Sequence, residues 1–217
     1  MTDTIIFDLD GTLLDTLDDI QDNVNLALAL YGFSGHTRDE ICSFLGNGVR
    51  ELVRCSLPKT VDEATVDKVL ACFLRFYLRH SVEKTVPYKG VMEMLAECKK
   101  RGYHTAIVSN KLDSAVKDLH HRFFRDVVDV AIGETPEISR KPSPDMVYKA
   151  VDMLGSTLAS SVYVGDSEVD IATAKNSGLK CVSVSWGFRD KEFLVNAGAE
   201  VIIDSPNELF AVLDGGM

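Results

Sequence analysis

Short apolar runs alternate with helical segments from Tyr88 onward, and this alternation sets the strongest limit on the fold. The apolar runs lie at 105–108, 127–132, 162–164, 181–184 and 201–203. Strands separated by helices pair in parallel, and the helices then cover both faces of the sheet. The apolar run at 5–7 has no other strand to pair with, so it joins the same sheet. The pattern therefore predicts an α/β protein with a doubly wound parallel sheet.

The segment after the first strand has a different period. From Leu17 to Tyr31, apolar residues recur every three or four positions, and Gly32 then ends the helix. Further helical patterns cover 38–46, 48–56 and 61–82. Because no good strand candidate interrupts this stretch, we expect residues 16–84 to form a small all-helical cap that closes over the strand ends. Residues 1–15 and 85–217 would then form the α/β core.

Composition limits the partners of the chain. The formal net charge is -10 at pH 7 and no run of lysine and arginine is present, which disfavours binding to nucleic acid. No apolar stretch approaches the roughly 20 residues that span a bilayer. The five cysteines are dispersed without a CxxC pair, as is typical of free thiols in a reducing compartment. We expect a cytoplasmic monomer or homodimer that acts on a small molecule.

Two aspartates follow the first strand and indicate chemistry. Asp8 and Asp10 lie two residues apart, so their side chains share one face while the strand geometry lasts, and Gly11 allows a sharp turn behind them. Adjacent carboxylates repel unless a cation or a shared proton separates them. Mg²⁺, which prefers oxygen ligands, would satisfy them. The alternative chemistry is that one carboxylate acts as a nucleophile and its neighbour as an acid and base. The ordinary alternative is a polar turn.

Polar residues also follow the later strands. Ser109 and Asn110 end the run at 105–108, Lys141 lies in the proline-stiffened loop RKPSP, and Asp166 follows the run at 162–164, with Asp170 one helical turn further on. Taken singly, Ser109, Asn110 or Asp166 could cap a helix, and Lys141 could be a surface charge. Ligands bind at the carboxyl ends of parallel strands. Together the residues therefore predict a phosphoryl-transfer centre.

These residues resemble four signatures of the haloacid dehalogenase superfamily of aspartate-nucleophile phosphatases: FDLDGT, SN, the lysine of RKPSP, and GDSEVD. The likeness extends over essentially the whole chain, and the helical insert is similar to the small cap of that superfamily. Dehalogenases of the superfamily lack the second aspartate of the first signature, so Asp10 favours phosphate chemistry. Within the superfamily, LGNGVREL, KPSPDMVYKA and VSWGFRDKEFLVNAGAEVIIDSPNEL are most like phosphoglycolate phosphatases.

The resemblance implies Mg²⁺ as cofactor and assigns the acids their roles. Asp8 would attack phosphorus to form an aspartyl phosphate and would also bind Mg²⁺. Asp10 would protonate the leaving alcohol, then activate water, with its backbone carbonyl on the metal. Asp166 would complete the metal ligands. Asp170 would orient the lysine or a metal-bound water, with Ser167 beside it in the outer part of the site.

The remaining residues would hold the substrate. By the same resemblance, Ser109 and the amide of Asn110 would bind the phosphoryl oxygens, and Lys141 would neutralise charge growing on them. Thr12 of the first signature is also placed among the substrate-binding residues. The expected activity is Mg²⁺-dependent hydrolysis of a small phosphomonoester, with 2-phosphoglycolate as the first choice. Related hydrolases of sugar phosphates, nucleotides or pyrophosphate share most of these signatures.

In the cap, Gly48 and Arg50 are candidate substrate-binding residues. Glycines in LGNGVR would let the backbone approach a ligand, and a helix beginning near Gly48 would direct amides at an anion. Arginine pairs with a carboxylate through two parallel hydrogen bonds, so Arg50 could recognise the carboxylate of phosphoglycolate. The alternative is an ordinary helix–helix turn with Arg50 as a solvated charge.

Two other classes of function remain open on the sequence. A signalling module could carry a phosphorylated aspartate that a partner recognises, although it would need neither the helical insert nor the late GDSEVD. A phosphomutase could reuse the aspartyl phosphate, with His36, Arg38 and Arg50 as its only obvious cap candidates. Turnover with and without a bisphosphate activator would separate these possibilities.

Overall fold

The computed structural model describes residues 2–80 and 82–215. The contacts within the chain divide it into two compact units, Met1–Leu14 with Pro87–Met217 and Asp15–Val86. The chain passes between the units twice. The two-residue strands β2 (Leu14–Asp15) and β3 (Val86–Pro87) lie at these crossings and pair with each other.

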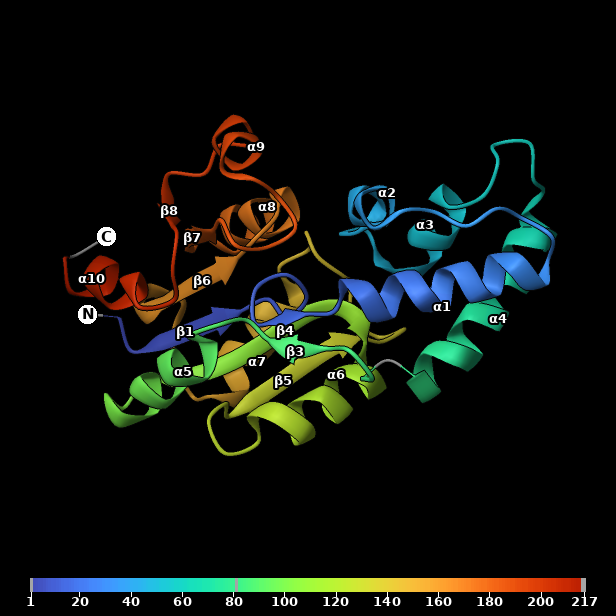
Figure 1. Ribbon diagram of the computed structural model, residues 1–217. Coiled ribbons are helices and arrows are strands. Elements are labelled where there is room, and N and C mark those ends of the chain that lie inside the picture. The colour runs from blue at the N-terminus through green and yellow to red at the C-terminus, as the bar shows by residue number, and fades with distance from the viewer. Residues whose placement is uncertain (1, 81, 216–217) are drawn as a thin grey trace. The chain divides into compact units, whose positions relative to one another are not determined.

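The larger unit is built on a parallel sheet (Figure 1). Over the described residues it has six strands in the order β5-β4-β1-β6-β7-β8, and each neighbouring pair is parallel. The strands are β1 (Thr4–Phe7), β4 (His104–Leu112), β5 (Val130–Glu134), β6 (Ser161–Gly165), β7 (Lys180–Val184) and β8 (Val201–Ile203). The chain starts at a central strand and extends the sheet to both sides, which confirms the predicted doubly wound α/β fold.

Helices cover this sheet on both faces. They are α5 (Val91–Lys100), α6 (Asp113–Leu119), α7 (Asp145–Met153), α8 (Glu168–Ser177), α9 (Lys191–Asn196) and α10 (Glu208–Asp214), with short turns η1 (His120–Phe124) and η2 (Leu158–Ser160). On one face, α7 and α8 pack on Ile6, Val108 and Tyr163 in one apolar cluster. The right-handed crossovers of parallel strands place α5 and α6 on the other face (Figure 1). Strands buried on both faces explain the continuous apolar runs in the sequence.

The smaller unit consists of helices over its described residues, apart from the strand ends at the crossings. These helices are α1 (Leu17–Leu30), α2 (Arg38–Phe44), α3 (Gly48–Cys55) and α4 (Glu63–His80). Gly32 adopts a φ of 76°, and its N–H donates to the carbonyl of Ala29, so α1 ends where the sequence predicts. Buried Asp19 of α1 accepts hydrogen bonds from the N–H groups of Lys84 and Thr85, which fastens the end of the unit to its first helix.

Two local expectations are wrong. The strand β5 begins at Val130 rather than at 127, because Val127 and Val128 still donate their N–H groups to the carbonyl of Phe124. The strand β4 continues to Leu112 through a register shift, and α6 begins only at Asp113. Ser109 and Asn110 therefore lie within β4, and the alternative that one of them caps a helix is wrong.

The described helices also bear on the membrane question. Within residues 2–80 and 82–215, no helix combines the length and the apolar character needed to cross a membrane.

Candidate active site

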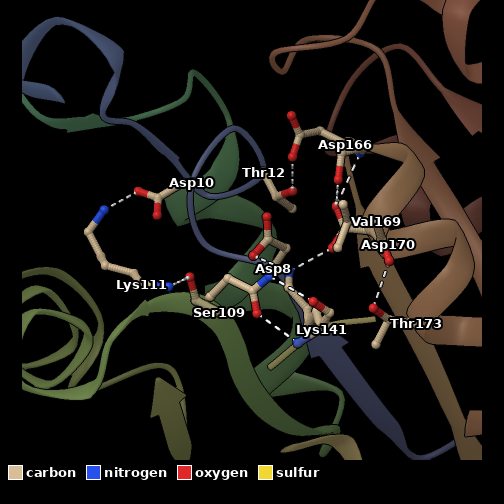
Figure 2. Close-up of polar contacts among 12 residues, drawn as sticks. Asp8, Asp10, Thr12, Ser109, Lys111, Lys141, Asp166, Val169, Asp170 and Thr173 are labelled. Carbon is tan, nitrogen blue, oxygen red and sulfur yellow. Dashed lines mark hydrogen bonds and ion pairs between the residues drawn. The ribbon is translucent and has the colours of Figure 1, made fainter. Parts of the chain in front are cut away.

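The predicted site residues of the larger unit gather at the carboxyl ends of its strands (Figure 2). Asp8 and Asp10 follow β1, Ser109 lies near the end of β4, and Asp166 follows β6. Lys141 comes from the loop between β5 and α7. All of these side chains except that of Asp10 are buried. The topology thus brings together residues that lie more than 150 positions apart in the sequence.

Lys141 is the centre of the arrangement. Its Nζ donates to Asp8 Oδ1 at 2.7 Å, to Asp170 Oδ1 at 2.7 Å and to the Tyr163 hydroxyl at 3.2 Å. Asn110 holds the backbone of Lys141 on both sides, because its side chain donates to the Lys141 carbonyl at 3.0 Å and accepts from the Lys141 N–H at 2.7 Å. The ammonium is therefore fixed against Asp8, as Figure 2 shows.

The side chain of Asn110 thus positions the lysine. The predicted contact of the Asn110 amide with a phosphoryl group stays a prediction. Tyr163 was not predicted from the sequence. It lies inside a buried strand, where tyrosine is an ordinary core residue, yet its hydroxyl donates to Asp170 Oδ1 at 3.1 Å.

Burial and charge shift the ionisation of these groups. Burial raises the pKa of the Asp8 carboxyl to about 7, even though the Lys141 ammonium acts to lower it. Burial also raises the pKa of Asp166 well above its usual range, and the charges of Asp170 and Asp8 add to this effect. Burial alone would lower the pKa of Lys141, but Asp170 and Asp8 outweigh it and raise that pKa well above its ordinary value. Lys141 therefore remains a cation at neutral pH.

Three buried carboxylates lie close enough to share one ion. Oxygen atoms of Asp8, Asp166 and Asp170 all lie within 4.8 Å of one another. When all three carboxyl groups are ionised, one lysine cannot balance them, and oxygen donors are the ligands that hard divalent cations prefer. The donor set therefore fits a divalent metal such as Mg²⁺. The Asp10 carboxylate is not among these three, and the family resemblance implies only the backbone carbonyl of Asp10 as a metal ligand.

The hydrogen bonds around Asp166 come from two other segments. Thr12 Oγ1 donates to Asp166 Oδ1 at 3.1 Å, and the N–H of Phe188 donates to Asp166 Oδ2 at 2.8 Å. Trp186 Nε1 donates to the Thr12 carbonyl at 3.0 Å, which ties the two segments together. The Thr12 hydroxyl thus contacts the predicted metal ligand, and substrate binding by Thr12 stays a prediction. The part played by the segment at 186–188 was not predicted.

Ser167 supports the side chain of Asp170 through both its backbone and its hydroxyl. Its N–H and hydroxyl both donate to Asp170 Oδ2, at 3.1 and 2.6 Å, while the other oxygen of Asp170 accepts from Lys141. Ser167 is the N-cap of α8, so the alternative that Asp166 caps this helix is wrong. Asp170 therefore contacts the lysine, and its implied role in orienting the lysine or a metal-bound water stays a prediction.

Asp10 has a partner of its own. Lys111 Nζ donates to Asp10 Oδ1 at 2.6 Å, and Figure 2 shows this pair beside the Asp8 cluster. The hydroxyl of Ser109 accepts from the Lys111 N–H at 3.2 Å. Lys111 was given no role from the sequence, although it directly follows the predicted residues Ser109 and Asn110.

The candidate residues of the smaller unit have structural surroundings. Helix α3 begins at Gly48, where φ is 80°, as the sequence predicts. The Arg50 guanidinium forms ion pairs with Glu63 and Asp67 of α4 on an exposed surface. These contacts link α3 to α4 and provide Arg50 with a structural role. Recognition of substrate by Gly48 and Arg50 stays a prediction.

Comparison with known proteins identifies the family. The model of the haloacid dehalogenase-like hydrolases matches residues 5–184, a span that contains Asp8, Lys141 and Asp166. The chain belongs to the haloacid dehalogenase-like hydrolases. Its fold, a parallel sheet flanked by helices, agrees with this membership. The predicted resemblance is confirmed.

Individual members of this hydrolase family add detail. A phosphoglycolate phosphatase from Pseudomonas syringae is 34% identical over 215 residues, which cover 94% of this chain and 77% of the relative. The crystal structure of a phosphoglycolate phosphatase candidate from Lactobacillus delbrueckii has a TM-score of 0.92 at 35% identity, over 96% of this chain and 97% of that one. The pyrophosphatase PpaX from Bacillus mycoides is 29% identical over 97% of this chain and 96% of the relative. The predicted class, a hydrolase of phosphoric monoesters, is confirmed.

Gly187 offers a test of the candidate metal site in this hydrolase. A Cβ at this position would lie 2.4 Å from the Asp166 Cβ and 2.4 Å from the Gly11 carbonyl oxygen, distances that force a displacement. We expect Gly187→Ala to weaken Mg²⁺ binding at least about tenfold, which corresponds to about 1.4 kcal/mol. Titration calorimetry on the metal-free protein measures this affinity.

The matched control is Gly215→Ala at the end of α10, where the nearest atom to an added Cβ is the Ala211 carbonyl oxygen at 3.1 Å. This variant should bind Mg²⁺ like the wild type. Equal affinity in Gly187→Ala and the wild type would show that the segment at 186–188 does not support the metal ligand.

Proposed function

We propose that this chain hydrolyses 2-phosphoglycolate with the help of Mg²⁺ and through a phosphorylated Asp8. The observation that carries the mechanism is the contact of Lys141 Nζ with Asp8 Oδ1 at 2.7 Å in a buried site. A carboxylate held there by a fixed cation is a preorganised nucleophile, and the same cation is placed to stabilise charge on an attached phosphoryl group. The names of the relatives support the choice of 2-phosphoglycolate.

In the first step, a carboxylate oxygen of Asp8 attacks phosphorus while the bond from phosphorus to the ester oxygen breaks. Asp10, protonated at the start of this step, donates its proton to the leaving oxygen, so that glycolate departs with a hydroxyl group and Asp10 is left as a carboxylate. In the second step, Asp10 accepts a proton from water as the water oxygen attacks phosphorus. The bond between Asp8 and phosphorus breaks, and inorganic phosphate and the free Asp8 carboxylate result.

The other residues bind and orient. Lys141 neutralises charge on the phosphoryl oxygens, and Asp170 and Asn110 hold the lysine in place. Ser109 is the proposed hydrogen-bond donor to a phosphoryl oxygen. The side chains of Asp8 and Asp166 and the backbone carbonyl of Asp10 would hold Mg²⁺, which supplies further positive charge to the phosphoryl group when bound.

A panel of phosphate esters tests the substrate. We expect the highest kcat/KM for 2-phosphoglycolate, with lower values for hexose phosphates and nucleoside monophosphates. Excess EDTA should abolish turnover, and added Mg²⁺ should restore it. Pyrophosphate belongs in the panel because of the similarity to a pyrophosphatase. A higher kcat/KM for pyrophosphate than for 2-phosphoglycolate would overturn the proposed substrate.

The cysteines support a proposal for the cellular location. Cys42, Cys55, Cys72, Cys98 and Cys181 are all free cysteines. Burial raises the pKa of Cys98 and of Cys181 to about 12, so both thiols stay protonated and unreactive. These features support a reducing compartment, and we propose the cytoplasm.

A further inference from the structure

The Lys111–Asp10 ion pair carries an inference beyond the proposed roles. Lys111 Nζ lies 2.6 Å from Asp10 Oδ1, although the two residues are 101 positions apart in the sequence. The Lys111 side chain is only 4% exposed and that of Asp10 19%. A buried lysine needs a counter-ion, and an ion pair with so little exposure to solvent holds both side chains in one geometry. The contact therefore limits where the Asp10 carboxylate can point.

Each of the two acids with a proposed catalytic role has a lysine of its own. Lys141 contacts Asp8 and Asp170, whereas Lys111 contacts Asp10. Both lysines are positioned by the end of β4. Asn110 holds the backbone of Lys141, and the Ser109 hydroxyl accepts from the N–H of Lys111. The register shift of β4 lies between Val108 and Leu112, so it includes the three consecutive residues 109–111 that make these contacts.

We propose that Lys111 is a positioning residue, which holds the Asp10 carboxylate where it exchanges a proton with the leaving oxygen and with water. This inference rests on the proposed function of Asp10. Lys111 acts through Asp10 and forms no bond with the substrate. Without the Lys111 ammonium, the Asp10 carboxylate would lose a contact that orients it, and proton transfer would slow down while Asp8, Lys141 and the metal ligands keep their places.

Leaving-group dependence provides the test. Glycolate leaves as a basic alkoxide and needs a proton, whereas p-nitrophenolate leaves without one, and general acid catalysis contributes typically about 10²–10⁴-fold. In single-turnover experiments, Lys111→Met should slow glycolate release from 2-phosphoglycolate about 10²-fold. First-turnover release of p-nitrophenolate from p-nitrophenyl phosphate should change less than about threefold. Lys111→Arg keeps the charge and should restore glycolate release to within about tenfold of the wild type.

A double variant tests whether Lys111 works through Asp10. If it does, Lys111→Met combined with Asp10→Asn should release glycolate no more slowly than Asp10→Asn alone, because the two effects are not additive. Titration calorimetry should find the Mg²⁺ affinity of Lys111→Met within about threefold of the wild type, which shows an intact site.

Three results would overturn the inference. The first is that Lys111→Met slows the release of glycolate and of p-nitrophenolate by the same factor. The second is that the double variant releases glycolate more slowly than Asp10→Asn by the full factor that Lys111→Met causes alone. The third is a rise in KM for 2-phosphoglycolate alone, which would make Lys111 a ligand of the substrate carboxylate. If wild-type protein releases neither leaving group, the proposed function fails instead.

Discussion

Replacing Asp8 with asparagine is expected to lower kcat at least about 10³-fold, because a neutral amide cannot serve as the nucleophile. The substitution nearly preserves the shape of the side chain, so the loss should appear in kcat with the fold intact. The measurement is steady-state turnover of 2-phosphoglycolate at saturating Mg²⁺. A variant that retains more than about a tenth of the wild-type kcat would contradict the covalent mechanism.

The stability of the same variant serves as its control. Burial raises the pKa of Asp8 to about 7, so the folded protein holds this proton more tightly than the unfolded chain does. Ionised Asp8 therefore destabilises the fold progressively as the pH rises from about 4 to about 7. Asp8→Asn removes this cost, and its metal-free form should unfold at pH 8 at the same temperature as the wild type or a higher one. A clearly lower unfolding temperature would mean that lost activity reports misfolding.

Replacing Lys141 with methionine should have two large effects. The variant should lose at least about 10²-fold in kcat, because the phosphoryl group loses a fixed positive charge. The metal-free protein should also lose about 3–5 kcal/mol of unfolding free energy, since Asp8, Asp166 and Asp170 remain buried without their cation. Urea denaturation in the presence of EDTA measures the second effect.

A double variant identifies the physical cause. Adding Asp170→Asn to Lys141→Met removes one of the buried negative charges that have lost their counter-ion, so the double variant should regain part of the lost unfolding free energy. A destabilisation below about 1 kcal/mol in Lys141→Met would show that this buried cation does not hold the carboxylates together. A double variant less stable than Lys141→Met would point to lost packing instead.

The sequence predicts the sheet well, for a physical reason. Strands of a parallel sheet are buried on both faces, so they leave continuous apolar runs, such as the one at 5–7, that stand out between helices. The acids at their ends are equally visible, because a carboxylate directly after such a run lies at the edge where ligands bind. Asp8 and Asp166 were identified in this way.

Other contacts depend on how strands and loops from distant parts of the sequence lie next to each other, which the pattern of a single strand does not reveal. The end of β4 has an irregular register, so its continuation to Leu112 and the later start of α6 could not be read from periodicity. Lys111 meets Asp10 only because β4 lies next to β1. The N–H of Phe188 reaches Asp166 from beyond the end of β7, and nothing in its side chain indicates a backbone contact.

Trapping the covalent intermediate tests the central claim most directly. Wild-type protein mixed with 2-phosphoglycolate and Mg²⁺ is quenched in acid within the first turnover, digested and examined by mass spectrometry. We predict a phosphoryl group on the peptide that contains Asp8, attached to that aspartate and released when turnover is allowed to finish. Rapid formation of phosphate with no phosphorylated residue, or with the phosphoryl group on a residue other than Asp8, would contradict the account.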